Sequence, residues 1–174
     1  EKLLDFPSGT LWMKRDDLIH PDVSGNKWRK LKGFFREVDP LRPVLTFGGA
    51  HSNHLRAAAF AFTHASIKGI AVVRGEELSP QHSLTLKYCE KMGMTLHFIP
   101  RSEYKVLREK DWLPTTRQLQ EWGSESAQIL PEGGAGRHAF EGCGEIWTEL
   151  DHKPDHLLIA SGTATTVLGI LSAM

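Results

Sequence analysis

The segment SGNKWRK, residues 24–30, contains three cations within four residues, and Lys27 differs from the other two in its surroundings. A helix that begins near Asn26, an acceptable N-cap, turns by about 100° per residue. On that helix Lys27 falls within an apolar stripe, and most other cations fall on the opposite face. The stripe contains Trp28, Leu31, Phe34, Phe35 and Val38. The opposite face contains Arg29, Lys32 and Arg36, with Lys30 at the margin.

This placement of Lys27 indicates two roles. In the first turn of a helix, the helix dipole and partial burial both disfavour the ammonium form, so the pKa of the amine falls. A larger neutral fraction is what a lysine needs in order to form a Schiff base. The alternative is a structural lysine whose aliphatic stem covers apolar surface while the ammonium group reaches water. The helical pattern alone leaves both roles open.

The loop FGGAHSNH, residues 47–54, joins an expected strand to an alanine-rich helix. Its two glycines allow a tight turn, and either Ser52 or Asn53 is suited to cap the helix. The same loop can also present a hydroxyl group, an amide and free N–H groups to a ligand. Helix capping and ligand binding both fit the pattern.

The turn SGTATT, residues 161–166, follows the apolar run HLLIA and precedes VLGIL. Unpaired N–H groups and side-chain hydroxyls converge where such a turn enters a helix, which makes it a good anion site. The turn lacks the lysine of a Walker loop, so a nucleoside triphosphate is disfavoured. Phosphate binding and a plain structural turn remain equal alternatives.

Three further patterns are weaker. Residues 131–145 contain five glycines, which indicates a hinge or a crossing between domains, with close approach to a cofactor as the alternative. His51 and His54 are three residues apart, but no acidic third ligand lies near them, so we predict no metal site. Ser52 does not lie in the G-x-S-x-G pattern of serine hydrolases.

The elements that must position these residues alternate between β-rich runs and segments of helical periodicity. The expected strands are 11–14, 43–47, 67–73, 95–99, 128–130 and 156–160. The expected helices are 27–38, 53–65, 79–92, 113–122, 137–150 and 165–174. This order predicts an α/β protein with open, mostly parallel sheets and helices on both faces. Residues 101–114 carry REKDW and a proline, and we expect them to form a surface connection.

The composition excludes several classes of protein. The 174 residues include 21 Lys and Arg against 21 Asp and Glu, so no excess charge favours a nucleic acid or an anionic membrane as partner. No apolar run approaches the roughly 18 residues that a membrane span needs. The two cysteines, Cys89 and Cys143, show no metal-ligand spacing and fit reduced thiols in a cytoplasmic protein.

Five segments, in this order, resemble the 1-aminocyclopropane-1-carboxylate (ACC) deaminase and D-cysteine desulfhydrase family. They are KRDDLIHPDVSGNKWRKLK (14–32), LTFGGAHSNHLRAAAFA (45–61), VVRGEE (72–77), LPEGG (130–134) and SGTATT (161–166). The resemblance implies a two-domain pyridoxal-phosphate enzyme of the tryptophan-synthase-β fold type, also called fold type II. It covers nearly the whole chain, and GNK-x-RK together with SNH is its most specific part.

The resemblance also implies roles for single residues. Lys27 would carry the cofactor covalently and act in catalysis, Asn53 would bind the ring hydroxyl, and Ser52 would face the substrate. The residues implied to cradle the phosphate are Ser161, Gly162, Thr163, Thr165 and Thr166. Members of the family commonly have glycine where this chain has Ala164. Alanine allows the backbone of the turn fewer conformations than glycine does.

A domain division follows from the same resemblance. Residues 44–130 would form a smaller inserted α/β domain, residues 1–43 and 131–174 would belong to the large domain, and the active site would lie between the two. The family usually continues for about a hundred residues or more beyond the phosphate turn, with the partner of the pyridine nitrogen and a tyrosine near the substrate. The chain also ends within the apolar run VLGILSAM, so we expect it to be incomplete or, alternatively, truncated and inactive.

The implied activity is the breakdown of a small amino acid to a 2-oxo acid and ammonia, in a homodimer. The deaminases tend to read SNQ where Ser52-Asn53-His54 stands, and the desulfhydrases read SNH. This difference favours β-elimination from D-cysteine, with ACC deaminase as the alternative. A non-catalytic Rossmann-like binding module, or an inactive fragment, is the alternative of another class.

Overall fold

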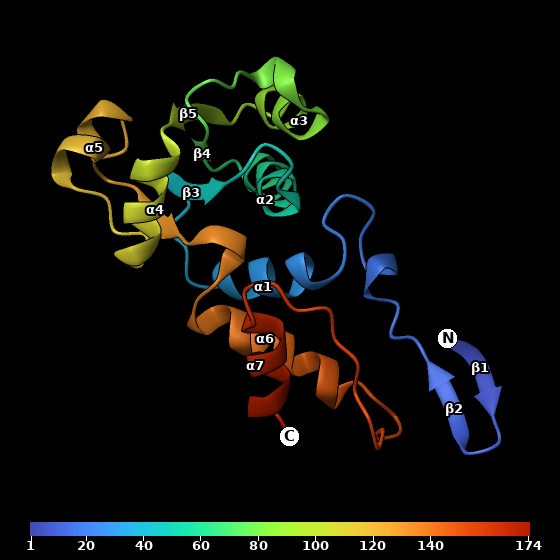
Figure 1. The fold of residues 1–174 in the computed structure, drawn as a ribbon. Coiled ribbons are helices and arrows are strands. Elements are labelled where there is room, and N and C mark those ends of the chain that lie inside the picture. The colour runs from blue at the N-terminus through green and yellow to red at the C-terminus, as the bar shows by residue number, and fades with distance from the viewer.

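The computed structural model describes residues 1–174 as a parallel β-sheet with helices on both faces, and a group of helices beside it (Figure 1). The sheet contains four strands in the order β5-β4-β3-β6. Their bounds are β3 Val44–Gly48, β4 Gly69–Arg74, β5 Thr95–Ile99 and β6 Gln128–Leu130. Every pairing in this sheet is parallel, which confirms the predicted α/β fold.

Two apolar cores lie on the two faces of the sheet. Successive residues of a strand point to opposite faces, so Val44 of β3 packs in one core, and Leu45 and Phe47 pack in the other. The first core is covered by α1 (Asn26–Phe34), α2 (Asn53–His64) and α3 (Leu84–Lys91). The second is covered by α4 (Arg101–Glu109) and by Trp122, which directly follows α5 (Thr116–Glu121). Burial on both faces explains why these strands read as continuous apolar runs.

Strands β3 and β6 end side by side at one edge of the sheet. The register pairs Thr46 of β3 with Leu130 of β6. After β3 the chain enters the loop that leads to α2, and after β6 it enters the 3-10 turn η3 (Glu132–Gly134). Because ligands bind at the carboxyl edge of parallel sheets, this edge is where we expect a site.

Three helices lie beside the sheet, with α1 and α7 (Thr165–Ser172) both packed on α6 (Arg137–Thr148) (Figure 1). Glycines bring their backbones together. A Cβ atom added to Gly33 would lie 2.3 Å from the carbonyl oxygen of His138, and one added to Gly142 would lie 2.1 Å from that of Arg29. None of the helices is both long and apolar enough to span a membrane.

The contact between α1 and α6 gives a prediction for Gly142. We expect Gly142→Ala to lower the free energy of unfolding by about 1–3 kcal/mol, because the new methyl group overlaps the carbonyl of Arg29 and the helices must separate. Urea denaturation measures the effect, and Glu141→Ala, at an exposed position of the same helix, should change stability by less than about 0.5 kcal/mol. Equal stabilities of the two variants would contradict the close contact.

The first two strands lie apart from the parallel sheet. Strand β1 (Lys2–Phe6) and strand β2 (Gly9–Trp12) form an antiparallel hairpin that extends away from the other elements (Figure 1). The strand predicted at 11–14 is therefore wrong in its bounds. Its residues pair with the N-terminal strand, which the sequence analysis did not predict.

Other predicted elements also need correction. The expected surface connection at 101–114 contains helix α4, because Tyr104 and Leu107 lie three residues apart on one face and both are buried. The expected strand at 156–160 is not a strand, because no other strand lies beside it to accept its hydrogen bonds. Three helices are shorter than predicted by three residues or more: α1 ends at Phe34, α3 begins at Leu84 after the 3-10 turn η2 (Pro80–His82), and α5 begins at Thr116.

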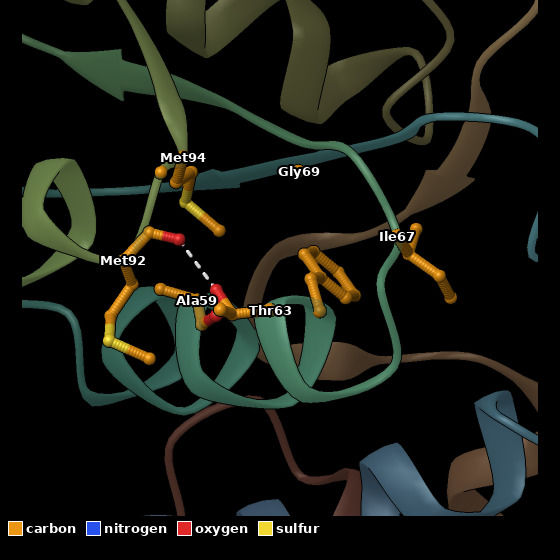
Figure 2. A pocket seen from close by; sticks show the side chains of 8 residues that line it. Ala59, Thr63, Ile67, Gly69, Met92 and Met94 are labelled. Carbon is orange, nitrogen blue, oxygen red and sulfur yellow. Dashed lines mark hydrogen bonds between the residues drawn. The ribbon is translucent and has the colours of Figure 1, made fainter.

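A small pocket lies under the C-terminal half of α2 (Figure 2). Its lining is mostly apolar, with Ala59 and Thr63 of α2 opposite Met92 and Met94. The hydroxyl of Thr63 donates a hydrogen bond to the carbonyl of Met92, which ties α2 to the segment before β5. The pocket contains no ionisable side chain and is separate from the loop at the N-terminal end of α2.

Candidate active site

Four segments meet around the amine of Lys27. They are the first turn of α1, the turn η3, the N-terminal end of α2 and the turn that leads into α7. The Nζ atom of Lys27 donates a hydrogen bond of 3.2 Å to the carbonyl oxygen of Gly133 in η3. Lys27 therefore points into the molecule, as the helical pattern predicts.

The surroundings of Lys27 favour its neutral amine. Burial lowers its pKa to about 8, and the neighbouring charge of Lys30 acts in the same direction. Cys143 and Glu132 oppose this effect weakly. About a tenth of the amine is therefore unprotonated at pH 7, far more than for an ordinary lysine, and the neutral form is the nucleophile.

The turn η3 brings its backbone against the site. Gly133 and Gly134 have φ values of 74° and 70°, which favour glycine. A Cβ atom on Gly133 would lie 3.1 Å from Cγ2 of Thr163 and 3.8 Å from Nζ of Lys27. The two glycines therefore let the main chain approach both residues. From the sequence alone, close approach of this backbone to a cofactor is only the weaker alternative to a hinge.

Helix α4 fixes the position of the same turn. The hydroxyl of Tyr104 donates to Oε1 of Glu132 at 2.9 Å, and Arg108 donates to Oε2 at 2.9 Å. Glu132 directly precedes Gly133, whose carbonyl holds Lys27. The helix that the sequence analysis missed thus supports the group that orients the amine.

Hydroxyl groups line the turn before α7. The Oγ1 atoms of Thr163 and Thr165 are 3.1 Å apart, and Asn26 donates from Nδ2 to Oγ1 of Thr166 at 3.0 Å. Ala164 occupies the N-cap position with a φ of 58°, so a left-handed residue turns the chain into the helix without glycine. Ser161 and Gly162 are exposed. The N–H groups of the first turn of α7 face this region without intrahelical partners.

Lys30 also belongs to the site, although the helical pattern places it only at the margin of the face opposite the apolar stripe. Its side chain is buried, with 2% of the residue exposed, and no carboxylate pairs with it. Its Nζ atom lies 3.4 Å from Oγ1 of Thr163, and burial lowers its pKa. A buried cation beside a hydroxyl-lined helix N-terminus is suited to bind an anion. The signal in the sequence that could have identified Lys30 is its position three residues after Lys27 in the helix.

The segment Ser52–His54 lies at the N-terminal end of α2. Ser52 caps the helix, because its Oγ atom accepts a hydrogen bond of 3.2 Å from the N–H of Leu55. Asn53 is exposed, and neither residue is hydrogen-bonded to Lys27. His54 is buried against the sheet and bonds to Thr46. The Asn26 N-cap that was expected for α1 is instead Gly25, with Asn26 as the first helical residue.

Known proteins are similar to this chain in sequence and in fold. A bifunctional D-cysteine desulfhydrase/ACC deaminase, mitochondrial, of Arabidopsis thaliana is 31% identical over 181 residues, which cover 95% of this chain and 45% of that protein. A D-cysteine desulfhydrase of Salmonella paratyphi A is 25% identical over 97% of this chain and 54% of its own length. These relatives support the ACC deaminase and D-cysteine desulfhydrase family that the five sequence segments indicate.

A solved structure supports the same family. A crystal structure of an ACC deaminase homologue superposes with a TM-score of 0.67 and 26% identity, over 92% of this chain and 50% of that one. This likeness confirms the predicted fold type of the family. No family model matches the chain. The chain spans about half the length of the relatives that it matches.

Proposed function

We propose that this chain acts, within its complete protein, as a pyridoxal-phosphate enzyme that converts a small amino acid to a 2-oxo acid and ammonia. The observation that carries the proposal is the placement of Lys27. Its half-buried amine, with a pKa lowered to about 8 by burial, lies beside the hydroxyl-lined N-terminus of α7, and the buried Lys30 of α1 reaches the same turn. An aldehyde-reactive amine and an anion site in one place suit a cofactor that has an aldehyde and a phosphate.

The residues of the site fit pyridoxal 5′-phosphate by their chemistry. Lys27 supplies the amine for covalent attachment, and the exposed amide of Asn53 is free to bind the ring hydroxyl. The phosphate is assigned to the turn 161–166, with Lys30 as its buried counter-charge. The donors assigned to the phosphate are Ser161, Gly162, Thr163, Thr165 and Thr166. When bound, this cofactor supplies an electron sink for the substrate's α-carbon.

The side chains of this chain then divide the remaining work. The amine of Lys27, released when the substrate binds, accepts the proton that the substrate's α-carbon loses. The carbonyl of Gly133 keeps that amine oriented at 3.2 Å, and the turn η3 is held in place by Glu132. The hydroxyl of Ser52, which already accepts from the N–H of Leu55, faces the substrate with its own proton to donate.

We favour D-cysteine as the substrate. Its β-elimination with water gives pyruvate, sulfide and ammonia, and it begins with loss of an α-proton, which suits a lysine amine of lowered pKa. The SNH sequence at 52–54 supports the same choice. ACC, the second candidate, has no α-proton, so its ring must be opened by a nucleophile or by attack at a ring methylene. The name of the Arabidopsis relative contains both activities.

Two measurements on the complete natural protein test the proposal. Visible absorbance that borohydride removes, with the label found on Lys27, supports the enzyme. A protein that takes up no pyridoxal phosphate contradicts it and leaves the non-catalytic binding module. Sulfide release from D-cysteine, measured beside 2-oxobutanoate release from ACC, then separates the two substrates.

Substitution of Lys30 is expected to raise the stability of the protein and to weaken its binding of pyridoxal phosphate. Lys30→Met removes a buried cation that has no carboxylate partner, so we expect the free energy of unfolding of the cofactor-free protein to rise by about 1 kcal/mol. The same change removes the counter-charge of the phosphate and should weaken pyridoxal-phosphate binding about 10-fold or more. Urea denaturation and absorbance titration measure the two effects. Unchanged cofactor affinity would show that Lys30 is not part of the phosphate site.

The wider organisation is part of the same proposal. Residues 44–130 form the smaller domain, and residues 1–43 and 131–174 contribute to the larger one, with the site between them. The four strands of the parallel sheet lie within 44–130, and α1, α6 and α7 lie outside it. A homodimer in the cytoplasm completes the proposal. Analytical ultracentrifugation of the complete protein tests the dimer, and fractionation of cells tests the location.

A further inference from the structure

His54 is the second residue of α2 and is buried between the sheet and the turn η3, with 2% of its surface exposed. Its Nε2 atom lies 2.7 Å from Oγ1 of Thr46. The hydroxyl of Thr46 also lies 2.8 Å from the carbonyl oxygen of Leu130 on the neighbouring strand. These two contacts determine which nitrogen of the imidazole carries the proton.

The hydroxyl of Thr46 has a single hydrogen, and a carbonyl oxygen can only accept. That hydrogen is therefore donated to Leu130, and Oγ1 of Thr46 must accept from His54. The imidazole consequently carries its proton on Nε2 and presents a lone pair on Nδ1. The ring stays neutral, because burial lowers its pKa to about 3 and the charges of Lys27 and Lys30 act in the same direction.

The Nδ1 atom of His54 is buried and has no hydrogen-bond partner. A buried acceptor without a partner costs about 1–3 kcal/mol, so its persistence calls for a physical reason. Nδ1 faces Gly134, where an added Cβ atom would lie 3.5 Å from it and 3.5 Å from Cβ of Lys30. The preceding residue, Gly133, accepts the hydrogen bond of Lys27.

The charges of two lysine amines act on this ring, and each amine has one hydrogen-bond partner elsewhere. The Nζ atom of Lys30 points to Thr163, on the phosphate side of the site. The Nζ atom of Lys27 is held only by the carbonyl of Gly133, in the turn that His54 faces. The other titratable groups that influence this amine are Glu132 of η3 and Cys143 of α6.

We propose that His54 is a positioning residue for Lys27, whose amine donates to Nδ1 of His54 when it leaves the carbonyl of Gly133. The two acceptors then define two places for the amine, one before and one after the substrate is bound. Thr46 fixes the ring by its bond to Nε2, so the second acceptor is preorganised. This inference rests on the proposed function, because it gives the freed amine a place in the reaction.

The tautomer is tested first, by ¹⁵N NMR of the histidine rings in the complete protein with and without pyridoxal phosphate. The expected result is one ring that stays neutral with its proton on Nε2 down to low pH, and His54→Gln assigns its signal. A proton on Nδ1 of that ring would overturn the proposal, because no acceptor would then face Lys27.

Two substitutions test the acceptor itself. Asparagine places its side-chain carbonyl near the position of Nδ1, and glutamine places its amide near the position of Nε2. In the protein that holds the reduced cofactor–substrate adduct N-phosphopyridoxyl-alanine, in which Lys27 is not attached to the cofactor, we expect His54→Gln to lower the pKa of Lys27 by about one unit, because an acceptor of the ammonium is lost. His54→Asn should keep that pKa within about 0.3 units. The pKa is measured by NMR of ¹³C-methylated lysines. Equal effects of the two substitutions, or none, would overturn the proposal.

Further variants control for folding and for the cofactor. Thr46→Val keeps the histidine but frees Nε2, so it should lower the pKa of Lys27 even if His54→Gln does not fold. His97→Gln changes another buried histidine nitrogen, on the edge strand β5, and should leave the pKa of Lys27 unchanged. Cofactor uptake by the unsubstituted protein is measured separately. Failure of uptake contradicts the proposed function, whereas normal uptake with an unaltered pKa in Thr46→Val and His54→Gln contradicts only the role of His54.

Discussion

Lys27→Ala is expected to abolish covalent attachment of pyridoxal phosphate and to reduce turnover by about 10³-fold or more. The amine is the group that both binds the aldehyde and moves the substrate's proton, and no nearby side chain replaces it. Lys30, the other lysine of the site, is directed towards Thr163. Lys27→Arg should fail as well, because a guanidinium stays protonated and does not form a Schiff base at neutral pH.

The matched control for this prediction is Lys32→Ala. Lys32 lies on the same helix, but it is exposed and pairs with Glu145. Its loss should leave the cofactor's absorbance and the turnover within about two-fold of the unsubstituted protein. Absorbance spectra, borohydride reduction and sulfide release provide the measurements. A Lys27→Ala protein that still forms a borohydride-sensitive linkage would show that another residue carries the cofactor.

Helical periodicity correctly predicted that Lys27 turns inward, but it misplaced Arg29. The pattern assigns every cation outside the apolar stripe to solvent, although Arg29 is among the largest fully buried side chains. A helical wheel records the polarity of one segment and contains no information on partners from other segments. The carboxylates that neutralise Arg29 are Asp16 and Glu149, which are 13 and 120 positions away. Burial of a paired charge is therefore a tertiary effect that local periodicity does not report.

The candidate site also has one part that local sequence patterns indicate and another that depends on contacts between distant segments. Motifs identified Lys27, the Ser52–Asn53 loop and the turn 161–166, because glycines, hydroxyls and a helix start are local signals. The contributions of Gly133, Lys30 and Glu132 depend on distances between segments that lie far apart in sequence. The missing strand at 156–160 has the same cause, since a β-rich run becomes a strand only beside another strand.

Arg29→Met is expected to destabilise the protein by about 3–5 kcal/mol. Arg29 bonds to both oxygens of Asp16, with 2.8 Å from Nη2 to Oδ1, and to Glu149 at 2.7 Å. The side chains of Arg29 and Asp16 are only 2% and 13% exposed, so removing the cation leaves a mostly buried carboxylate with Lys14, 3.3 Å away, as its remaining charged partner. Glu149 is 44% exposed, and water screens its share of the effect. Urea denaturation measures the loss, and Arg36→Met, at an exposed position of the turn that follows α1, should cost less than about 0.5 kcal/mol.

The dependence on pH distinguishes this pairing from simple loss of packing. The hydrogen bond from Arg29 lowers the pKa of Glu149 to about 2, and Arg29 also lowers the pKa of Asp16 although burial opposes it. A carboxylate whose pKa is lower in the folded state contributes stability above its ordinary pKa of about 4, and this stability is lost as the pH falls through the folded value. The unsubstituted protein should therefore lose stability between about pH 5 and pH 2, and Arg29→Met should lose less over that range. If the variant retains the full acid dependence, the ion pairs are not its cause. Adding Asp16→Asn to Arg29→Met should then recover part of the lost stability, because the mostly buried carboxylate that has lost Arg29 is removed as well.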